Sequence, residues 1–268
     1  GIPVPGDQNH VMYVWFDALT NYISTLGWPE NEIDSEGGFQ KYWINGTPTQ
    51  YCGKDNTRFQ SAMWQAMLMA AGIQGSHQIV VNGFITADGG VKMSKTLGNV
   101  VDPKDIVEEY GTDALRYFLS KEISNFEDSP FTKERFKDSY NSGLANGLGN
   151  LTSRILTMSE AHLENGVETN ETEYPEYFNY LNAFEIHKAT NLIWKQISAL
   201  DLLIQTEEPF KVIKTDPEKG RKTIENLVVE LHRIAIMLTP IMPETSSKIL
   251  ELIKANEKPT QPLFLRKD

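Results

Sequence analysis

The sequence predicts an α/β unit with a partial parallel sheet over residues 1–128, followed by an all-α helical bundle over residues 129–268. Two observations support this division. Short apolar runs alternate with segments of helical periodicity until about residue 125, the pattern of units that form parallel sheets. From about Thr132 onwards apolar residues recur only at helical spacing, and packing such helices in a bundle buries their apolar faces.

Three short apolar runs in the first part are predicted strands, at residues 11–16, 50–52 and 78–81. The first of them is expected to be buried. Helices are predicted over residues 18–26 and over a segment with apolar residues at helical intervals, namely Phe59, Met63, Met67 and Ala70. Gly72 is suited to cap the second helix. Because ligands bind beyond the carboxyl ends of parallel strands, functional residues are expected in the loops that follow these strands.

Helical periodicity in the second part forms several apolar stripes. One stripe consists of Phe136, Tyr140, Leu144, Leu148, Leu151, Ile155 and Met158. A second consists of Leu181, Phe184, Leu192, Ile193, Ile197, Leu200 and Ile204. A further helix is expected to begin at Pro217, because Asp216 is a favourable N-cap and proline suits the first helical position. The last helix is predicted around residues 244–254.

The composition of the 268 residues, 40% hydrophobic and 23% charged, predicts a folded globular protein. No apolar run approaches the ~20 residues that span a bilayer. Cys52 is the only cysteine, which excludes an internal disulfide framework and a cysteine-rich zinc site in this segment. A cytoplasmic location is the simplest expectation. The formal net charge of -11 argues against a broadly basic surface, so any RNA contact is expected to use a local basic patch.

The most informative motif is KMSKTLGN at residues 92–99, which follows two glycines and precedes a helix predicted to start near Asp102. Two lysines three residues apart on a glycine-hinged loop suit polyphosphate binding, because each ammonium is a compact charge on a flexible stem. A bare lysine pair at this spacing is more often a solvated basic loop. The complete octapeptide is far more specific.

This octapeptide resembles the KMSKS signature of class I aminoacyl-tRNA synthetases, with Thr96 in place of the last serine. YVWFDALTNY at residues 13–22 and GKDN at residues 53–56 resemble the methionyl branch, and the resemblance covers almost the whole chain. It implies that residues 1–128 are the C-terminal half of a Rossmann-like catalytic domain and that residues 129–268 are an anticodon-binding helical domain. The implied activity is ATP-dependent conversion of L-methionine to methionyl-adenylate, with Mg²⁺, and transfer of methionine to tRNA(Met).

The resemblance implies catalytic roles for Lys92 and Lys95, which would stabilise charge on the triphosphate and on the departing pyrophosphate. Met93 and Ser94 would complete the ATP-binding loop with the two lysines. For Ser94, a simple turn role is an equally open interpretation.

Seven residues match positions of the family's methionine-binding site: Trp15, Ala18, Leu19, Tyr22, Asp55, Gln60 and Trp64. Aromatic walls suit a thioether, although core packing is the commoner role of such aromatic residues. Asp55 would receive the substrate ammonium or a ribose hydroxyl, or would cap the helix that follows it. Gln60 stands where many members have histidine, so its role is open.

Asn150 and Arg154 are spaced i, i+4 on a predicted helix and fit an element that contacts the anticodon in the family. Phe210 follows a proline at the place of the family's anticodon-stacking tryptophan, and phenylalanine can also stack on a base. The alternative interpretations are a surface polar pair for Asn150 and Arg154, and ordinary core packing for Phe210.

A HIGH-type motif, which binds ATP phosphates in class I synthetases, is absent from the sequence, and its five histidines are scattered. We therefore expect the chain to lack the N-terminal half of the catalytic domain and to be inactive alone. Two main alternatives are a noncatalytic tRNA-binding fragment and another class I synthetase for an apolar amino acid. A phosphate-binding α/β protein unrelated to tRNA is a third.

Overall fold

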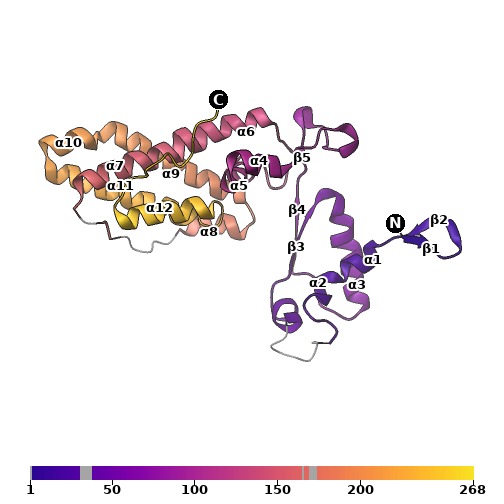
Figure 1. The fold of residues 1–268 in the computed structure, drawn as a ribbon. Coiled ribbons are helices and arrows are strands. Elements are labelled where there is room, and N and C mark those ends of the chain that lie inside the picture. Colours follow the sequence, from indigo (N-terminus) through magenta and orange to yellow (C-terminus); the bar gives the residue numbers. More distant parts are fainter. Residues whose placement is uncertain (1, 31–37, 165, 169–173) are drawn as a thin grey trace. The chain divides into compact units, whose positions relative to one another are not determined.

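The computed structural model describes residues 2–30, 38–164, 166–168 and 174–268, and Figure 1 shows the order of its elements. The side chain of Lys95 also lies outside the described part. The chain forms two compact units, Gly1–Phe84 and Ile85–Asp268. This division concerns packing, whereas the boundary expected at residue 128 concerns function and stays a prediction.

The first unit begins with an antiparallel hairpin of β1 (Ile2–Val4) and β2 (Asp7–Met12). The prediction of a buried strand over residues 11–16 is wrong. The strand ends at Met12, and the apolar run is exposed, with 60% of Val11 and 61% of Phe16 accessible. The physical reason is that a two-stranded hairpin has no second layer to cover its apolar side chains, and no other described strand pairs with it.

Both predicted helices of the first unit form. The first consists of α1 (Trp15–Leu19) and α2 (Asn21–Ser24). The second begins as a wider helical turn, Arg58–Met63, and continues as α3 (Trp64–Ala70). Gly72 ends it with a φ of 70°, which confirms the expected glycine cap. A further wide turn, Phe39–Ile44, adds to the core of this unit, whose buried members are Leu19, Ile23, Phe39, Trp43, Phe59, Trp64 and Leu68.

The parallel sheet is confirmed for two of the three predicted strands. β3 (Thr49–Gly53) pairs with β4 (Gln78–Asn82) in parallel, from Thr49 opposite Gln78 to Gly53 opposite Asn82. The sheet has two strands among the described residues. Gly53 closes β3 at its carboxyl end, so the GKDN segment begins at the edge where a parallel sheet places its ligands.

The second unit begins with β5 (Ile85–Thr86), which pairs in parallel with β6 (Ser129–Pro130). These strands are too short to leave a periodic signal in the sequence, and neither was predicted. The loop that carries the KMSKTLGN motif at residues 92–99, called the lysine loop below, follows β5. It leads to α4 (Pro103–Tyr110) and α5 (Thr112–Lys121). The Asp102 carboxylate accepts a hydrogen bond from the Lys104 N–H at 2.9 Å, which confirms the helix start.

The bundle is built from α6 (Lys133–Ser139), α7 (Asn150–His162), α8 (Pro175–Asn182), α9 (Ile186–Glu207), α10 (Pro209–Thr215), α11 (Pro217–Leu238) and α12 (Pro243–Ala255) (Figure 1). A wide helical turn, Tyr140–Gly149, joins α6 to α7. Every member of the first predicted stripe is buried. The second stripe is interrupted, because Phe184 adopts a φ of 58° between α8 and α9.

The Asp216 carboxylate accepts a hydrogen bond from the Lys219 N–H at 3.0 Å, which confirms the cap predicted for α11. The last helix, α12, also forms where it was expected. Within the described residues no helix is long and apolar enough to cross a bilayer. Nor do three or more His, Cys, Asp or Glu side chains of the described chain gather in a way that could hold a metal ion.

Candidate functional site

An aromatic cluster in the first unit joins α1 and α2 to the helix that follows Arg58. The Trp15 ring stacks on Phe59, with centroids 4.2 Å apart and planes 4° from parallel. The Tyr22 ring is tilted against Trp64 at 5.9 Å. Gln60 connects the two segments, because its Nε2 donates a hydrogen bond to the Tyr22 Oη at 2.9 Å. Four of the predicted methionine-site residues therefore lie in one cluster, together with Phe59.

Two polar atoms in this cluster are buried without a hydrogen-bond partner among the described residues, the Gln60 Oε1 and the Trp64 Nε1. Gln60 is 3% exposed and Trp64 is 1% exposed, so bulk water does not satisfy them. An unsatisfied buried polar atom costs roughly 1–3 kcal/mol. The two unpartnered atoms do not stabilise the fold. Buried polar atoms without partners are rare in native proteins, and they concentrate at functional sites.

The remaining predicted methionine-site residues differ in burial. Leu19 is buried in the core, whereas Ala18 and Asp55 are exposed. The interpretation of Asp55 as the N-cap of the following helix is wrong, because that helix, Arg58–Met63, has Thr57 at its N-cap position. Asp55 does lie near the end of β3, where its charge acts on Cys52. Burial raises the pKa of the Cys52 thiol, a hydrogen bond with Thr57 lowers it, and the Asp55 charge raises it.

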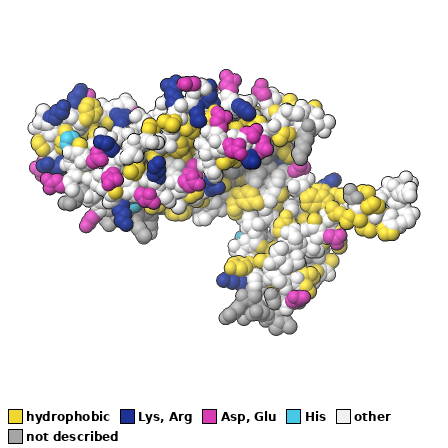
Figure 2. Space-filling model, in the orientation of Figure 1, with side chains coloured by type: hydrophobic (Ala, Val, Ile, Leu, Met, Phe, Trp, Pro, Cys, Tyr) yellow, Lys and Arg dark blue, Asp and Glu magenta, His cyan; other side chains and the backbone are white. Residues whose placement is uncertain are grey.

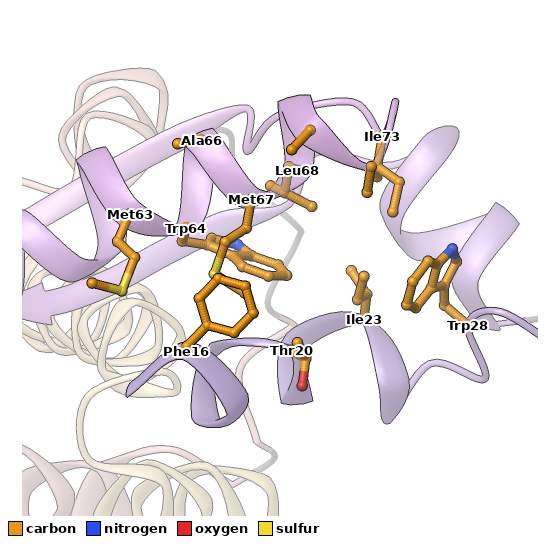
Figure 3. A pocket seen from close by; sticks show the side chains of 12 residues that line it. Phe16, Thr20, Ile23, Trp28, Met63, Trp64, Ala66, Met67, Leu68 and Ile73 are labelled. Carbon is orange, nitrogen blue, oxygen red and sulfur yellow. The ribbon is translucent and has the colours of Figure 1, made fainter. Parts of the chain in front are cut away.

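An apolar groove of about 530 Å³ runs along the neighbouring face of the same helices (Figure 3). Phe16, Met63 and Met67 lie at one end, and Trp28 and Ile73 lie at the other. Trp64 is the single predicted site residue in its lining. The groove is therefore distinct from the Tyr22 and Gln60 contact, and it shares one tryptophan with the aromatic cluster.

The lysine loop is closed by hydrogen bonds within itself. Gly89 and Gly90 adopt φ values of 68° and 77°, so both glycines form a turn that other residues rarely adopt. Lys92 then forms an antiparallel bridge with Thr86 of β5. Met93 is partly buried against the core of the second unit. The side chain of Lys95 lies outside the described part, but its backbone opens a short helical turn, Lys95–Leu97.

Ser94 has the contacts of a turn residue. Its Oγ accepts a hydrogen bond from the Thr96 N–H at 3.2 Å, and its carbonyl accepts one from the Leu97 N–H at 3.1 Å. Sequence reasoning gave no role to Asn99, whose Oδ1 accepts from the Ser94 N–H at 2.8 Å. The signal was the residue type, since asparagine beside glycine often bonds to nearby backbone.

The predicted anticodon residues lie on α7 and α10. Asn150 is exposed at the start of α7, and Arg154 forms an ion pair with Asp201 of α9. Gln205 donates a hydrogen bond from its Nε2 to the Asp201 Oδ2 at 2.6 Å. Sequence reasoning missed Asp201 and Gln205, although their i, i+4 spacing on a helix was visible.

Phe210 is 42% exposed, so the interpretation as ordinary core is wrong. The Nζ of Lys211 lies 5.9 Å from the centroid of its ring. Figure 2 shows Lys and Arg interspersed with Asp and Glu on the drawn face of the helical bundle, without a continuous basic surface there. This distribution agrees with the expectation that any RNA contact uses a local patch.

Comparisons with known proteins cover both units. A family model described as "tRNA synthetases class I (M)" matches residues 1–156, and a model of the "anticodon binding domain of methionyl tRNA ligase" matches residues 154–262. The methionine–tRNA ligase of Fusobacterium nucleatum is 38% identical over 93% of this chain, and that of Caldanaerobacter subterraneus is 36% identical over 96%. The chain spans 41% and 42% of these relatives' lengths.

Solved structures agree with these matches. Mycobacterium tuberculosis methionyl-tRNA synthetase bound by methionyl-adenylate superposes with a TM-score of 0.79 and 32% identity, over 94% of this chain and 52% of that one. The apo form of the same synthetase gives a TM-score of 0.81 and 28% identity, over 100% of this chain and 58% of that one. Matches to both family models and to curated relatives show that the chain belongs to the methionyl-tRNA ligase family of class I tRNA synthetases.

Proposed function

We propose that this chain is part of a methionine–tRNA ligase, which activates L-methionine with ATP and transfers it to tRNA(Met). The observation that carries the proposal is the aromatic cluster, in which the Gln60 amide holds Tyr22 beside Trp64. One of the structures that the chain resembles is a synthetase bound by methionyl-adenylate. The N-terminal half of the catalytic domain would come from the part of the relatives' length that this chain does not span.

In the proposed site, the methionine side chain is bound by the aromatic cluster together with Ala18 and Leu19. Contacts between a thioether sulfur and aromatic rings contribute ~0.3–1.5 kcal/mol each. The Gln60 Oε1 and the Trp64 Nε1 would acquire partners when the pocket is filled by substrate or by ordered water. Asp55, exposed just after β3, would pair with the substrate ammonium or a ribose hydroxyl.

The lysine loop would bind ATP through Lys92, Met93, Ser94 and Lys95. In adenylate formation the methionine carboxylate attacks the α-phosphorus, and the bond to pyrophosphate breaks. Catalysis of such a transfer consists mainly of positioning and charge stabilisation. Lys92 and Lys95 would stabilise the negative charge that collects on the departing pyrophosphate, and Mg²⁺ would enter with the triphosphate oxygens that it prefers as ligands.

The helical bundle would bind the anticodon of tRNA(Met), with Asn150 and Arg154 as polar readers and Phe210 as a stacking ring. The exposure of Phe210 favours this role over core packing. The functional boundary would lie at residue 128, and a cytoplasmic location suits an enzyme of protein synthesis. A noncatalytic tRNA-binding fragment is the second candidate, and the same three residues would serve it equally well.

Replacing Arg154 with alanine is expected to weaken binding of a CAU anticodon stem-loop by about tenfold or more, because a base-reading arginine is worth about 1–3 kcal/mol. Loss of the guanidinium also leaves the Asp201 carboxylate without this ion pair. Fluorescence anisotropy with a labelled stem-loop measures the change. Arg233→Ala is the matched control, because Arg233 also forms an ion pair and is 34% exposed, against 33% for Arg154. Equal losses for the two variants would remove Arg154 from the anticodon site.

A methionyl-adenylate analogue is expected to raise the melting temperature of the chain, because a ligand that binds only the folded state stabilises it. Tyr22→Phe should reduce that shift, since the variant removes the hydroxyl that accepts from Gln60 and leaves the buried amide without this bond. Tyr42→Phe removes the same atom from an exposed tyrosine of the Phe39–Ile44 turn and should leave the shift unchanged. A tRNA stem-loop that binds while the analogue gives no shift would favour the noncatalytic candidate.

A further inference from the structure

We infer that Asn99 is the positioning residue of the lysine loop, a role that rests on the phosphate-binding function proposed for Lys92 and Lys95. Its carboxamide makes two bonds to the backbone of the segment that carries them. The Oδ1 accepts from the Ser94 N–H at 2.8 Å, and the Nδ2 donates to the Lys92 carbonyl at 3.3 Å. Asn99 therefore holds the backbone on both sides of Met93.

The chemistry of this brace requires a donor and an acceptor on one short side chain. A carboxamide supplies both, whereas a carboxylate supplies only acceptors and a hydroxyl cannot span the two positions at once. Gly98, with a φ of 65°, turns the chain so that Asn99 faces back towards Lys92. A residue with a Cβ is strained in that conformation. The glycine and the asparagine thus act together in closing the loop.

The neighbouring bonds that the structure describes in this loop have different places. The Thr86 bridge fixes only the entry at Lys92, and the bonds that Ser94 receives from Thr96 and Leu97 are local to the next turn. The two bonds of Asn99 connect the Lys92 backbone, where the loop enters, to the turn that begins at Ser94. Met93 is packed on the core of the second unit, so the braced segment is also tied to the body of that unit.

The consequence is a loop whose lysines begin from a fixed backbone. Each lysine side chain still loses rotamer freedom on binding a phosphate, but the backbone that carries it is already ordered. Preorganisation of this kind increases affinity by reducing the entropy lost on binding. Asn99 does not need to touch the phosphates to affect them, because it acts through the main chain of Lys92 and Ser94.

The test uses the whole chain with inorganic tripolyphosphate as the probe, and it compares Asn99→Ala with Lys92→Ala. Calorimetry measures the affinity, and hydrogen exchange measures protection of the Ser94 amide. We expect Asn99→Ala to weaken binding by about fivefold to tenfold, the effect of one or two lost hydrogen bonds. The same variant should expose the Ser94 amide to exchange. Lys92→Ala should weaken binding more and leave the Ser94 amide protected.

Two further variants separate positioning from general damage. Asn146→Ala removes an exposed asparagine from the bundle and should change neither readout. Asn99→Asp retains the acceptor for the Ser94 N–H, so it should keep much of the protection yet still bind tripolyphosphate more weakly. All variants should melt within about 2 °C of the parent, since the loop contributes little to the core.

The outcomes distinguish the inference from the function on which it rests. If Lys92→Ala weakens binding and Asn99→Ala changes neither affinity nor Ser94 protection, the positioning role is overturned while the proposed function stands. If the parent chain does not bind tripolyphosphate, or Lys92→Ala leaves its affinity unchanged, the phosphate-binding function fails and the inference fails with it.

Discussion

Gly220→Ala is expected to lower the free energy of unfolding of the helical unit by about 2 kcal/mol. Alanine in place of a helix-interior glycine ordinarily stabilises by roughly 0.5–1 kcal/mol, so the expected sign is reversed. The reason is the close approach of α10 to α11. A Cβ on Gly220 would lie 2.5 Å from the Ile213 Cα and 2.8 Å from the Ile213 N, and backbone atoms cannot rotate away.

Urea unfolding followed by circular dichroism measures the effect. Gly147→Ala is the graded control, because the nearest atom to its Cβ is the Ser142 carbonyl oxygen at 3.2 Å, and it should cost much less. Adding Ile213→Ala to Gly220→Ala removes the Ile213 side chain but leaves the backbone clash. The double variant should therefore not recover the lost stability, and a recovery would assign the clash to the side chain instead.

The same substitution is expected to weaken stem-loop binding, although Gly220 lies on α11. Displacement of α10 moves Phe210, which occupies the second position of that short helix. Arg154→Ala should differ from Gly220→Ala in one respect. It should reduce binding with little loss of stability, because its ion pair is partly exposed and such pairs contribute about 0–1 kcal/mol.

Local signals in the sequence predicted the bundle well. Asp216 followed by proline predicts a helix start from the bonding of one side chain to a nearby N–H, which needs no knowledge of the rest of the fold. The stripe that includes Leu144 and Ile155 is equally local in its periodicity. The prediction that Phe184 continues a helical stripe fails for a local reason as well. Phe184 adopts a left-handed φ, which is uncommon for a residue other than glycine and gives no signal in the apolar pattern.

Contacts between distant segments were beyond the reach of such signals. The apolar run at residues 11–16 indicated a buried strand, but burial depends on a covering layer, and the hairpin has none. Gln60 and Tyr22 are 38 positions apart, and Arg154 and Asp201 are 47 apart. Family resemblance identified Gln60 and Arg154 because it matches single positions of the sequence to the family's motifs. It did not identify the side chain that each of them contacts. The fold supplies those partners.

Alkaline pH is expected to destabilise the helical unit through two buried tyrosines. Burial raises the pKa of Tyr117 to about 12, helped by the charge of Glu122 and opposed by a hydrogen bond with Ser139. Burial also raises the pKa of Tyr177 to about 12. An unfolded tyrosine ionises near pH ~10. Between these values the unfolded chain binds fewer protons than the folded chain, so stability is full below pH ~10 and falls as pH rises towards 12.

Each tyrosine contributes about 2–3 kcal/mol to this loss, since one pKa unit corresponds to about 1.4 kcal/mol. Urea unfolding at a series of pH values from neutral to alkaline measures the slope. Tyr117→Phe and Tyr177→Phe should each flatten it.

Burial and hydrogen bonding can be separated by the same variants. The Tyr177 Oη donates to the Met237 carbonyl at 2.5 Å, whereas the two bonds of the Tyr117 Oη are longer, one accepted from the Ser139 Oγ at 3.2 Å and one donated to the Ser139 carbonyl at 3.4 Å. Tyr177→Phe should therefore cost about 1 kcal/mol at neutral pH, and Tyr117→Phe should cost less. Some dependence of stability on pH should persist in the double variant that combines Tyr117→Phe with Tyr177→Phe, because burial raises the pKa of Tyr140 in the same direction. An unchanged slope in the double variant would mean that water reaches both hydroxyls, and the close packing of α5 and α8 against the bundle would then be wrong.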